Sequence, residues 1–333
     1  MEPNKAHMES TKPGVAKREE AIGADASTGQ SSGLRPIVPG VWFREGVRCC
    51  NNIVIEMNDY LIVVDANYPG PAQMLISEVK KVFAKPIKYV IDTHSDEDHL
   101  YGNAVFTRMG AITIAHTGVL EDIERYEPVH WRRVSQVRKD VADLNLPGPE
   151  PPQQTFTGSL YVISDGNRRV ELRHFGWGHT RGDVFVYLPR ERVLCTGDSV
   201  GNGAWGDPKR AYMGNWANQI RAAQKLDVER VLPGHGEPGG PELLEGQIQF
   251  FEELYRAVKA AIREGKTLDQ LVTMKEGRPF ATALQLPRPM MEDYVPHGPE
   301  LRPWQVSRFP TQVRNTYVEI TQGKPYGEIA GGA

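Results

Sequence analysis

The chain has 333 residues, of which 40% are hydrophobic and 24% are charged, and its formal net charge is −3. This is ordinary globular composition, long enough for a sizeable core, and the absence of a long basic run argues against nucleic-acid or anionic-membrane partners. Three cysteines are too few for a disulfide scaffold, and no apolar run reaches the roughly 18 to 20 residues of a membrane span.

The first 36 residues are polar, rich in Gly, Ser and charge, and without apolar periodicity. We therefore expect a flexible arm over 1–36. A helix is expected over 71–84, where apolar residues recur at helical spacing after Pro71. Short apolar runs typical of strands surround it, at 41–45, 52–57, 60–66 and 87–92.

The same order of elements recurs in the second half of the chain. A helical segment at 117–144 is expected to break around Pro128. Further helices are expected at 215–226 and 241–265, and strands at 111–115, 159–165, 168–175, 183–189, 192–198 and 229–235. Two similar halves of strands and helices predict an α/β fold in which two mixed sheets pack face to face with helices outside.

We expect the main domain to occupy 37–265. The remainder, 266–333, is helical and Pro-rich, with too little alternating pattern for a separate nucleotide domain. This extension is expected to pack on the core, and it offers a surface for a homodimer. The chain is expected to be soluble, either cytoplasmic or, if a signal segment was removed, periplasmic or secreted.

The stretch DTHSDEDHLYGN, residues 92–103, concentrates histidine and carboxylate side chains directly after a strand. Loops at the carboxyl ends of strands are where α/β proteins usually place their sites. Three later Gly-flanked loops each add one ligand-type residue: His179 in GWGHT, Asp198 in CTGDS and His235 in LPGHGEP. So many N and O ligands on such loops predict a centre of two metals.

Five ordered motifs carry a family resemblance: IVVDA with Asp65, THSDEDH, GHTRGDVFVYLP, LCTGD and LPGHG. On these motifs the chain resembles the metallo-β-lactamase fold superfamily of hydrolases, over roughly Val38 to Arg263. The resemblance implies an αβ/βα four-layer sandwich with two mixed β-sheets. It also implies two divalent metals, with zinc expected.

The resemblance assigns the residues as follows. The first metal would be held by His94, Asp96 and His179. The second would be held by Asp98, His99 and His235, with Asp198 bridging both. Asp98 and Asp198 would be catalytic, Asp98 orienting a metal-bound hydroxide for hydrolysis, and Asp65 would support the ligands at its strand end.

Asp96 departs from the family pattern, which normally has histidine at this position. Three carboxylates against two divalent ions predict a milder Lewis acid and a higher pKa of the bridging water. The extra carboxylate favours iron or manganese over zinc at the first site. Alternatively, Asp96 turns away and leaves a single metal.

A small organic substrate with an ester, thioester, lactone, sulfate ester or β-lactam bond is expected. Aromatic and cationic residues near the expected mouth predict a mid-sized, anionic substrate. The residues expected to contact it are Trp177, Arg181, Trp205 and Tyr212, with Lys209, Arg210 and Trp216 nearby.

Two other classes of function stay open. A non-haem diiron redox protein is one, because such proteins have a carboxylate at the position of Asp96, although this chain has no room for their usual flavodoxin domain. A metal-binding pseudo-enzyme is the other. His116 is expected to be structural, since the ligand set is complete without it, whereas Asn103 and His174 are expected either to support the ligands or to be structural.

Overall fold

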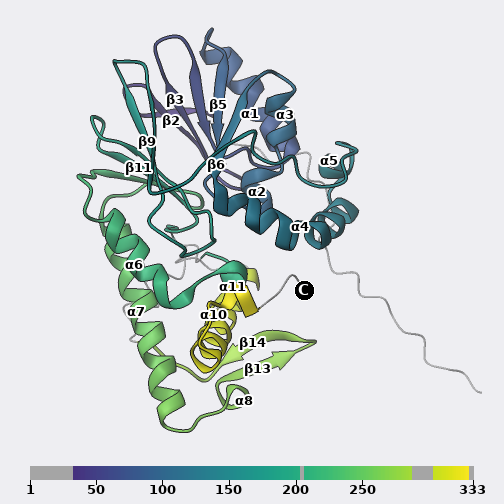
Figure 1. The fold of residues 1–333 in the computed structure, drawn as a ribbon, viewed down its shortest axis with the longest axis vertical. Coiled ribbons are helices and arrows are strands. Elements are labelled where there is room, and N and C mark those ends of the chain that lie inside the picture. The colour runs from purple at the N-terminus through teal and green to yellow at the C-terminus, as the bar shows by residue number, and fades with distance from the viewer. Residues whose placement is uncertain (1–32, 203–205, 287–302, 330–333) are drawn as a thin grey trace, which may run out of the picture.

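The computed structural model describes residues 33–202, 206–286 and 303–329. Two large β-sheets pack face to face, and helices cover their outer faces (Figure 1). This is the four-layer αβ/βα sandwich that the sequence predicted.

The first sheet has seven strands in sequential order, antiparallel from β1 to β4 and parallel from β4 to β7. Its strands are β1 (Arg35–Val38), β2 (Val41–Arg44), β3 (Asn52–Glu56), β4 (Leu61–Val64), β5 (Ile87–Ile91), β6 (Ile112–His116) and β7 (Gln154–Phe156). β1 begins before the expected end of the arm, and β7 was not expected. Both are edge strands of the sheet.

The second sheet has five strands in the order β12-β11-β10-β9-β8. They are β8 (Leu160–Ser164), β9 (Arg169–Arg173), β10 (Phe185–Leu188), β11 (Val193–Gly197) and β12 (Arg230–Pro233). All neighbours are antiparallel except β11 and β12, which are parallel.

Strand alternation explains why both faces of each sheet are covered. In β4, Ile62 and Val64 belong to the core between the two sheets, whereas Leu61 and Val63 pack with helix α1 (Pro69–Val82) outside. Every one of these side chains is fully buried. Burying a Val, Leu or Ile side chain contributes about 1.5–3 kcal/mol, so strands with two apolar faces are stable only between two layers.

The helices form the two outer layers. With the first sheet lie α1, α2 (Glu97–Leu100), α3 (Asn103–Thr107), α4 (Thr117–Val137) and α5 (Lys139–Ala142) (Figure 1). Against the second sheet lie α6 (Met213–Ala223) and α7 (Glu242–Arg263), preceded by the short 3₁₀ helix η1 (Pro208–Arg210). The expected helices are therefore present, with ends shifted by a few residues.

The break that we expected at Pro128 is wrong. Helix α4 runs through this proline and ends only at Arg138, whose backbone is extended. Glu127 and Trp131 are buried on either side of the proline. Tertiary packing of the helix therefore offsets the roughly 3 kcal/mol that an interior proline costs.

The C-terminal part packs against the helices that cover the second sheet. It contains α8 (Leu268–Leu271), a hairpin of β13 (Val272–Lys275) and β14 (Arg278–Thr282), α10 (Pro303–Gln322) and α11 (Tyr326–Ile329). Helix α10 packs against α6, α7 and β14, and α11 against η1. The sequence predicted helix where β13 lies. Among the described residues, no helix has the length and apolar character needed to cross a membrane.

The two sheets meet at the edge where β5, β11 and β12 end. There the backbone N–H of Val184, just before β10, donates to the carbonyl of Thr93, just after β5 (2.8 Å). β10 is antiparallel to β11, so its start lies at the edge where β11 ends. The loops that follow or precede these strand ends consequently converge on one site.

Candidate metal centre

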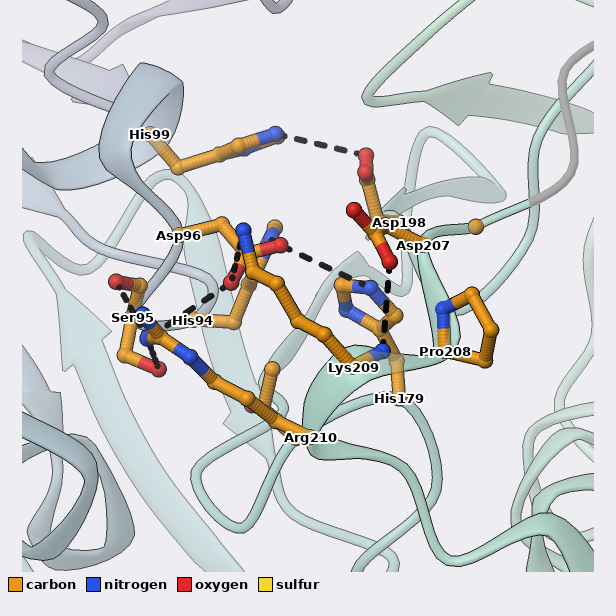
Figure 2. A network of polar contacts seen from close by, with 12 residues as sticks. His94, Ser95, Asp96, His99, His179, Asp198, Asp207, Pro208, Lys209 and Arg210 are labelled. Atoms are coloured by element: carbon orange, nitrogen blue, oxygen red, sulfur yellow. Dashed lines mark hydrogen bonds and ion pairs between the residues drawn. The ribbon is translucent and has the colours of Figure 1, made fainter. Parts of the chain in front are cut away.

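His94, Asp96 and His179 form one cluster, which we call the first donor group (Figure 2). Oδ2 of Asp96 lies 3.8 Å from Nε2 of His94 and 3.7 Å from Nε2 of His179. His94 comes from the loop after β5, Asp96 immediately precedes α2, and His179 lies in the loop before β10. All three are buried.

Asp98, His99 and His235 form the second donor group. Oδ1 of Asp98 lies 3.8 Å from Nε2 of His99, and its Oδ2 lies 3.2 Å from Nε2 of His235. The first two residues are neighbours in α2, and His235 follows β12. His235 is 25% exposed and Asp98 19%, so this group reaches the surface of the site.

Asp198 lies between the two groups, directly after β11. Its Oδ1 is 3.3 Å from Nε2 of His99 and 3.5 Å from Nε2 of His235. The same residue also clusters with His94 and His179, all three ligand atoms lying within 4.8 Å of one another. Burial opposes its ionisation, but His235 and His99 outweigh burial and lower the pKa of Asp198 well below its usual value.

The side chains in this centre fit a metal. Nε2 of His94, His99 and His179 and Oδ1 of Asp198 are buried and have no hydrogen-bond partner in the described part of the chain. Leaving buried polar atoms unpaired costs free energy, and such atoms converging on one point are typical of a ligand set. Imidazole nitrogen with carboxylate oxygen suits zinc, iron or manganese.

The state of His94 matches this role. Burial, together with the neighbouring imidazoles of His99 and His179, lowers the pKa of His94 well below its usual value. The ring is therefore neutral at neutral pH. A neutral imidazole keeps the lone pair that a metal ligand needs.

Asp65 fixes the ring of His99. Its Oδ2 lies 2.9 Å from Nδ1 of His99, and it accepts hydrogen bonds from the backbone N–H (2.8 Å) and hydroxyl (3.0 Å) of Thr93. The contact with Nδ1 leaves Nε2 facing the centre. Asp65 has a φ of +65°, an uncommon conformation for a non-Gly residue. The geometry agrees with the supporting role predicted for Asp65.

Asp183 supports His179. The sequence analysis did not identify Asp183 as a functional residue. It accepts hydrogen bonds from the backbone N–H of His179 (2.7 Å), the backbone N–H and hydroxyl of Thr180 (2.9 and 2.7 Å), and the side-chain amide of Gln219 (2.8 Å). The available signal was its place four residues after His179 in the same Gly-rich turn.

Lys209 and Arg210 flank Asp96 (Figure 2). Both lie 3.6 Å from the same oxygen, Oδ1. Burial opposes ionisation of Asp96, but these cations and then the imidazoles outweigh it and lower the pKa of this carboxyl below its usual value. Arg210 is only 2% exposed, and Trp216 is fully buried. Neither therefore lies on an open wall of the mouth.

The predicted substrate contacts engage one another. Nε1 of Trp177 donates to the carbonyl of Arg210 (2.8 Å), and Tyr212 packs edge-on against the Trp177 ring. The Arg181 guanidinium lies over that ring (3.9 Å) and 3.4 Å from Asp122. Trp205 lies outside the described residues. Contacts of these four residues with a substrate stay a prediction.

His116, His174 and Asn103 lie outside both donor groups. The rings of His116 and His174 stack at 3.7 Å, and Nδ1 of His116 accepts from the backbone of the following helix. Asn103 donates to Asp92 (2.8 Å). These contacts agree with the structural role expected for His116 and with the structural alternative for His174 and Asn103.

Comparison with known proteins places this geometry in a family. Residues 46–235 match the model of the metallo-beta-lactamase superfamily. A type 2 metallo-beta-lactamase of Bacillus cereus is 28% identical over 202 residues, covering 58% of this chain and 70% of that protein.

Other relatives have different activities. The alpha subunit of a 2,4-dinitroanisole O-demethylase from Nocardioides sp. (strain JS1661) is 25% identical over 245 residues, covering 72% of this chain and 69% of the relative. A human acyl-coenzyme A thioesterase is 28% identical over 178 residues, covering 50% and 62%. The solved metallo-beta-lactamase from Pontibacter korlensis has a TM-score of 0.54 at 20% identity, covering 66% of this chain and 98% of that one, which shows a shared fold.

Proposed function

We propose that this chain, which belongs to the metallo-beta-lactamase superfamily, is a hydrolase with two divalent cations at its centre. Its relatives include a metallo-beta-lactamase and an acyl-coenzyme A thioesterase. The substrate is a small organic molecule with an ester, thioester, lactone, sulfate ester or β-lactam bond. Relatives named for lactam and thioester chemistry support this range.

The place of Asp198 carries the proposal of two cations. Its Oδ1 is within 3.5 Å of the second donor group's imidazoles, and the residue also clusters with those of the first. A carboxylate between two sets of imidazole nitrogens supports one cation on each side. Each donor group offers three side chains of its own, which leaves room for solvent or substrate.

Bound divalent metals would supply Lewis acidity toward water and toward a substrate oxygen. The chain's own residues supply position. The buried first group keeps bulk water from one side of the centre, and Asp65 and Asp183 fix two of the imidazole-bearing segments. Asp98 is partly exposed, so a carboxylate oxygen of this residue can accept a proton from the attacking water.

The test combines metal analysis with a substrate panel. Protein purified without added metal is assayed for zinc, iron and manganese, and then for hydrolysis of a β-lactam, an acyl-coenzyme A thioester, a lactone, a carboxylic ester and a sulfate ester. We expect two metal ions per chain, and turnover of at least one compound that Asp98→Asn abolishes. Turnover that survives complete removal of metal would contradict the proposal.

A diiron redox protein is the second candidate. The observation that favours it is the carboxylate of Asp96 in the first donor group, because an added oxygen ligand suits iron better than zinc. Iron at both positions, together with oxygen reduction and no hydrolysis of the panel, would favour this candidate over the hydrolase.

A further inference from the structure

The two oxygens of Asp96 face different partners. Oδ1 lies 3.6 Å from both the ammonium of Lys209 and the guanidinium of Arg210. Oδ2 lies 3.7–3.8 Å from the imidazoles of His179 and His94. The carboxylate thus lies between a pair of cations and two histidines that could bind a metal (Figure 2).

A pair of cations beside a site that fits a divalent metal makes metal binding less favourable. Coulomb repulsion between the pair and an ion held by His94 and His179 would be weakly screened, because the two histidines, Asp96 and Arg210 are buried. Among the described residues, Asp96 is the one carboxylate within 4 Å of both the cations and the two imidazoles. Asp96 therefore separates the cation pair from the metal position.

The outer sides of the cations are paired with glutamates. Lys209 donates to Glu97 (2.9 Å), and Arg210 donates to Glu127 (2.6 Å). Two cations and three carboxylates, Asp96 included, leave this partly buried cluster a formal charge of −1. The charge count from sequence, which considered only the ligands, omitted the cations.

The segment that carries the pair is held from several sides. The carbonyl of Pro208 accepts from the side-chain amide of Asn315 (2.9 Å), and that of Arg210 accepts from Trp177 (2.8 Å). The backbone N–H of Gly327 donates to the carbonyl of Ala211 (3.0 Å). Fixing 208–211 on both sides, from the core and from the C-terminal extension, fixes the two cations relative to Asp96.

We propose that Lys209 and Arg210 are positioning residues of the metal centre, which hold Oδ1 of Asp96 and offset its charge so that Oδ2 serves the cation held by His94 and His179. The proposal rests on the proposed metal centre and deepens it. Asp96, Lys209 and Arg210 then act as one unit. The histidine common in the family cannot replace Asp96 alone, because it would leave the cation pair facing the metal.

A double-substitution cycle tests this coupling. The variants are Asp96→His, Lys209→Met and the two together, and zinc affinity is measured by competition with a chromophoric chelator. Asp96→His should weaken binding of one of the two zinc ions by about tenfold or more. Adding Lys209→Met to Asp96→His should restore most of that affinity, whereas Lys209→Met alone, which releases Oδ1 of Asp96, should weaken binding, though less than Asp96→His does.

Lys85→Met is the matched control. Lys85 is 32% exposed, against 30% for Lys209, and likewise pairs with a glutamate, Glu56 at 2.8 Å, but lies outside the centre. Lys85→Met should leave zinc affinity unchanged, both in the otherwise unsubstituted chain and together with Asp96→His. Asp96→Asn keeps the size of the side chain and replaces Asp96→His in this cycle if histidine prevents folding. The expected changes in zinc affinity are the same. The absorption spectrum of the cobalt(II)-loaded protein should change with Asp96→Asn and be unchanged with Lys85→Met.

Three results would overturn the proposal. The first is an Asp96→His chain that binds two zinc ions as tightly as the unsubstituted chain. The second is a Lys209→Met effect of equal size in both backgrounds, which indicates a merely structural lysine. The third is an unsubstituted chain that binds no divalent cation, which rejects the proposed centre as well. Two bound zinc ions without coupling reject the positioning role alone.

Discussion

The two donor groups differ in their surroundings. The first is buried and lies against a cluster of ion pairs that includes Arg210 and Glu127. The second reaches solvent through Asp98 and His235, and Nδ1 of its buried ring, His99, contacts the carboxylate of Asp65. We therefore propose a division of tasks, in which charge and burial fix the first group and the second group contacts the substrate.

Breaking the ion cluster behind the first group should have the largest effect. Arg210→Met leaves Glu127, which is 1% exposed, without its cation. Removing one partner of a buried pair costs about 3–5 kcal/mol of unfolding free energy. Urea unfolding of the metal-free protein measures this loss.

Arg221→Met supplies the contrast for that experiment. Arg221 and Glu252 form a pair at the surface, with about two fifths of each side chain exposed, so its loss should cost less than about 1 kcal/mol. Equal losses in the two variants would show that the buried cluster does not stabilise the first group's surroundings.

Asp65→Asn should act on the second group. Both oxygens of Asp65 face donors, whereas an amide has only one acceptor oxygen, so its NH2 group would face either Nδ1 of His99 or the backbone N–H of Thr93 and the ring would lose its fixed orientation. Loss of such a partner typically lowers metal affinity 10–100-fold. Zinc titration should show one weakened ion and one unchanged. Weakening of both to the same degree would contradict the separate support of the two groups.

Much of this architecture follows from local sequence. The strands of both sheets have uninterrupted or alternating apolar runs, and the ligand loops carry short, Gly-flanked motifs, so the sandwich and the convergence of the seven ligand candidates could be predicted. β7 could not, because its Gln-Thr-Phe segment follows prolines and has no apolar alternation. The segment 267–274 was predicted as helix, although β13 begins at Val272, since the pairing of β13 with β14 depends on contact with α10.

The surroundings of Asp96 illustrate a second limit. Local pattern showed that Asp96 adds negative charge but not that Lys209 and Arg210, more than a hundred residues later, lie beside it. Such a contact depends on the path of the whole chain. The aromatic and cationic residues after Asp198 were consequently read as a substrate wall, although Arg210 is buried.

Gly327→Ala should disturb the first group from the C-terminal extension. A Cβ at this position would lie 2.5 Å from the carbonyl oxygen of Arg210 and 2.6 Å from the Trp177 ring. Relieving that overlap should cost about 1–3 kcal/mol and displace the cation pair. Gly148→Ala, at a position with open space, is the control. Unchanged stability and zinc binding in Gly327→Ala would contradict the prediction.

Burial of Asp122 predicts a pH dependence of stability. Burial raises the pKa of Asp122 to about 7, although Arg210 and Ser95 act in the opposite direction. A carboxyl whose pKa is raised in the folded state favours folding at low pH, and this contribution is lost as pH rises from about 4 to about 7.

Asp122→Asn should remove this part of the pH dependence. Between about pH 5 and pH 8, the unsubstituted metal-free chain should lose about 2–3 kcal/mol more unfolding free energy than the variant. Urea unfolding at the two pH values measures it. Parallel pH dependence in the two proteins would show that Asp122 ionises normally in the fold.

The central claim is that Asp96, held by Lys209 and Arg210, completes a first metal site beside a second one. Anomalous X-ray diffraction from crystals of the zinc-loaded protein tests this most directly. We expect two peaks, one among His94, Asp96 and His179 and one among Asp98, His99 and His235. A single peak at the second group, with Asp96 bound only to the two cations, would contradict it.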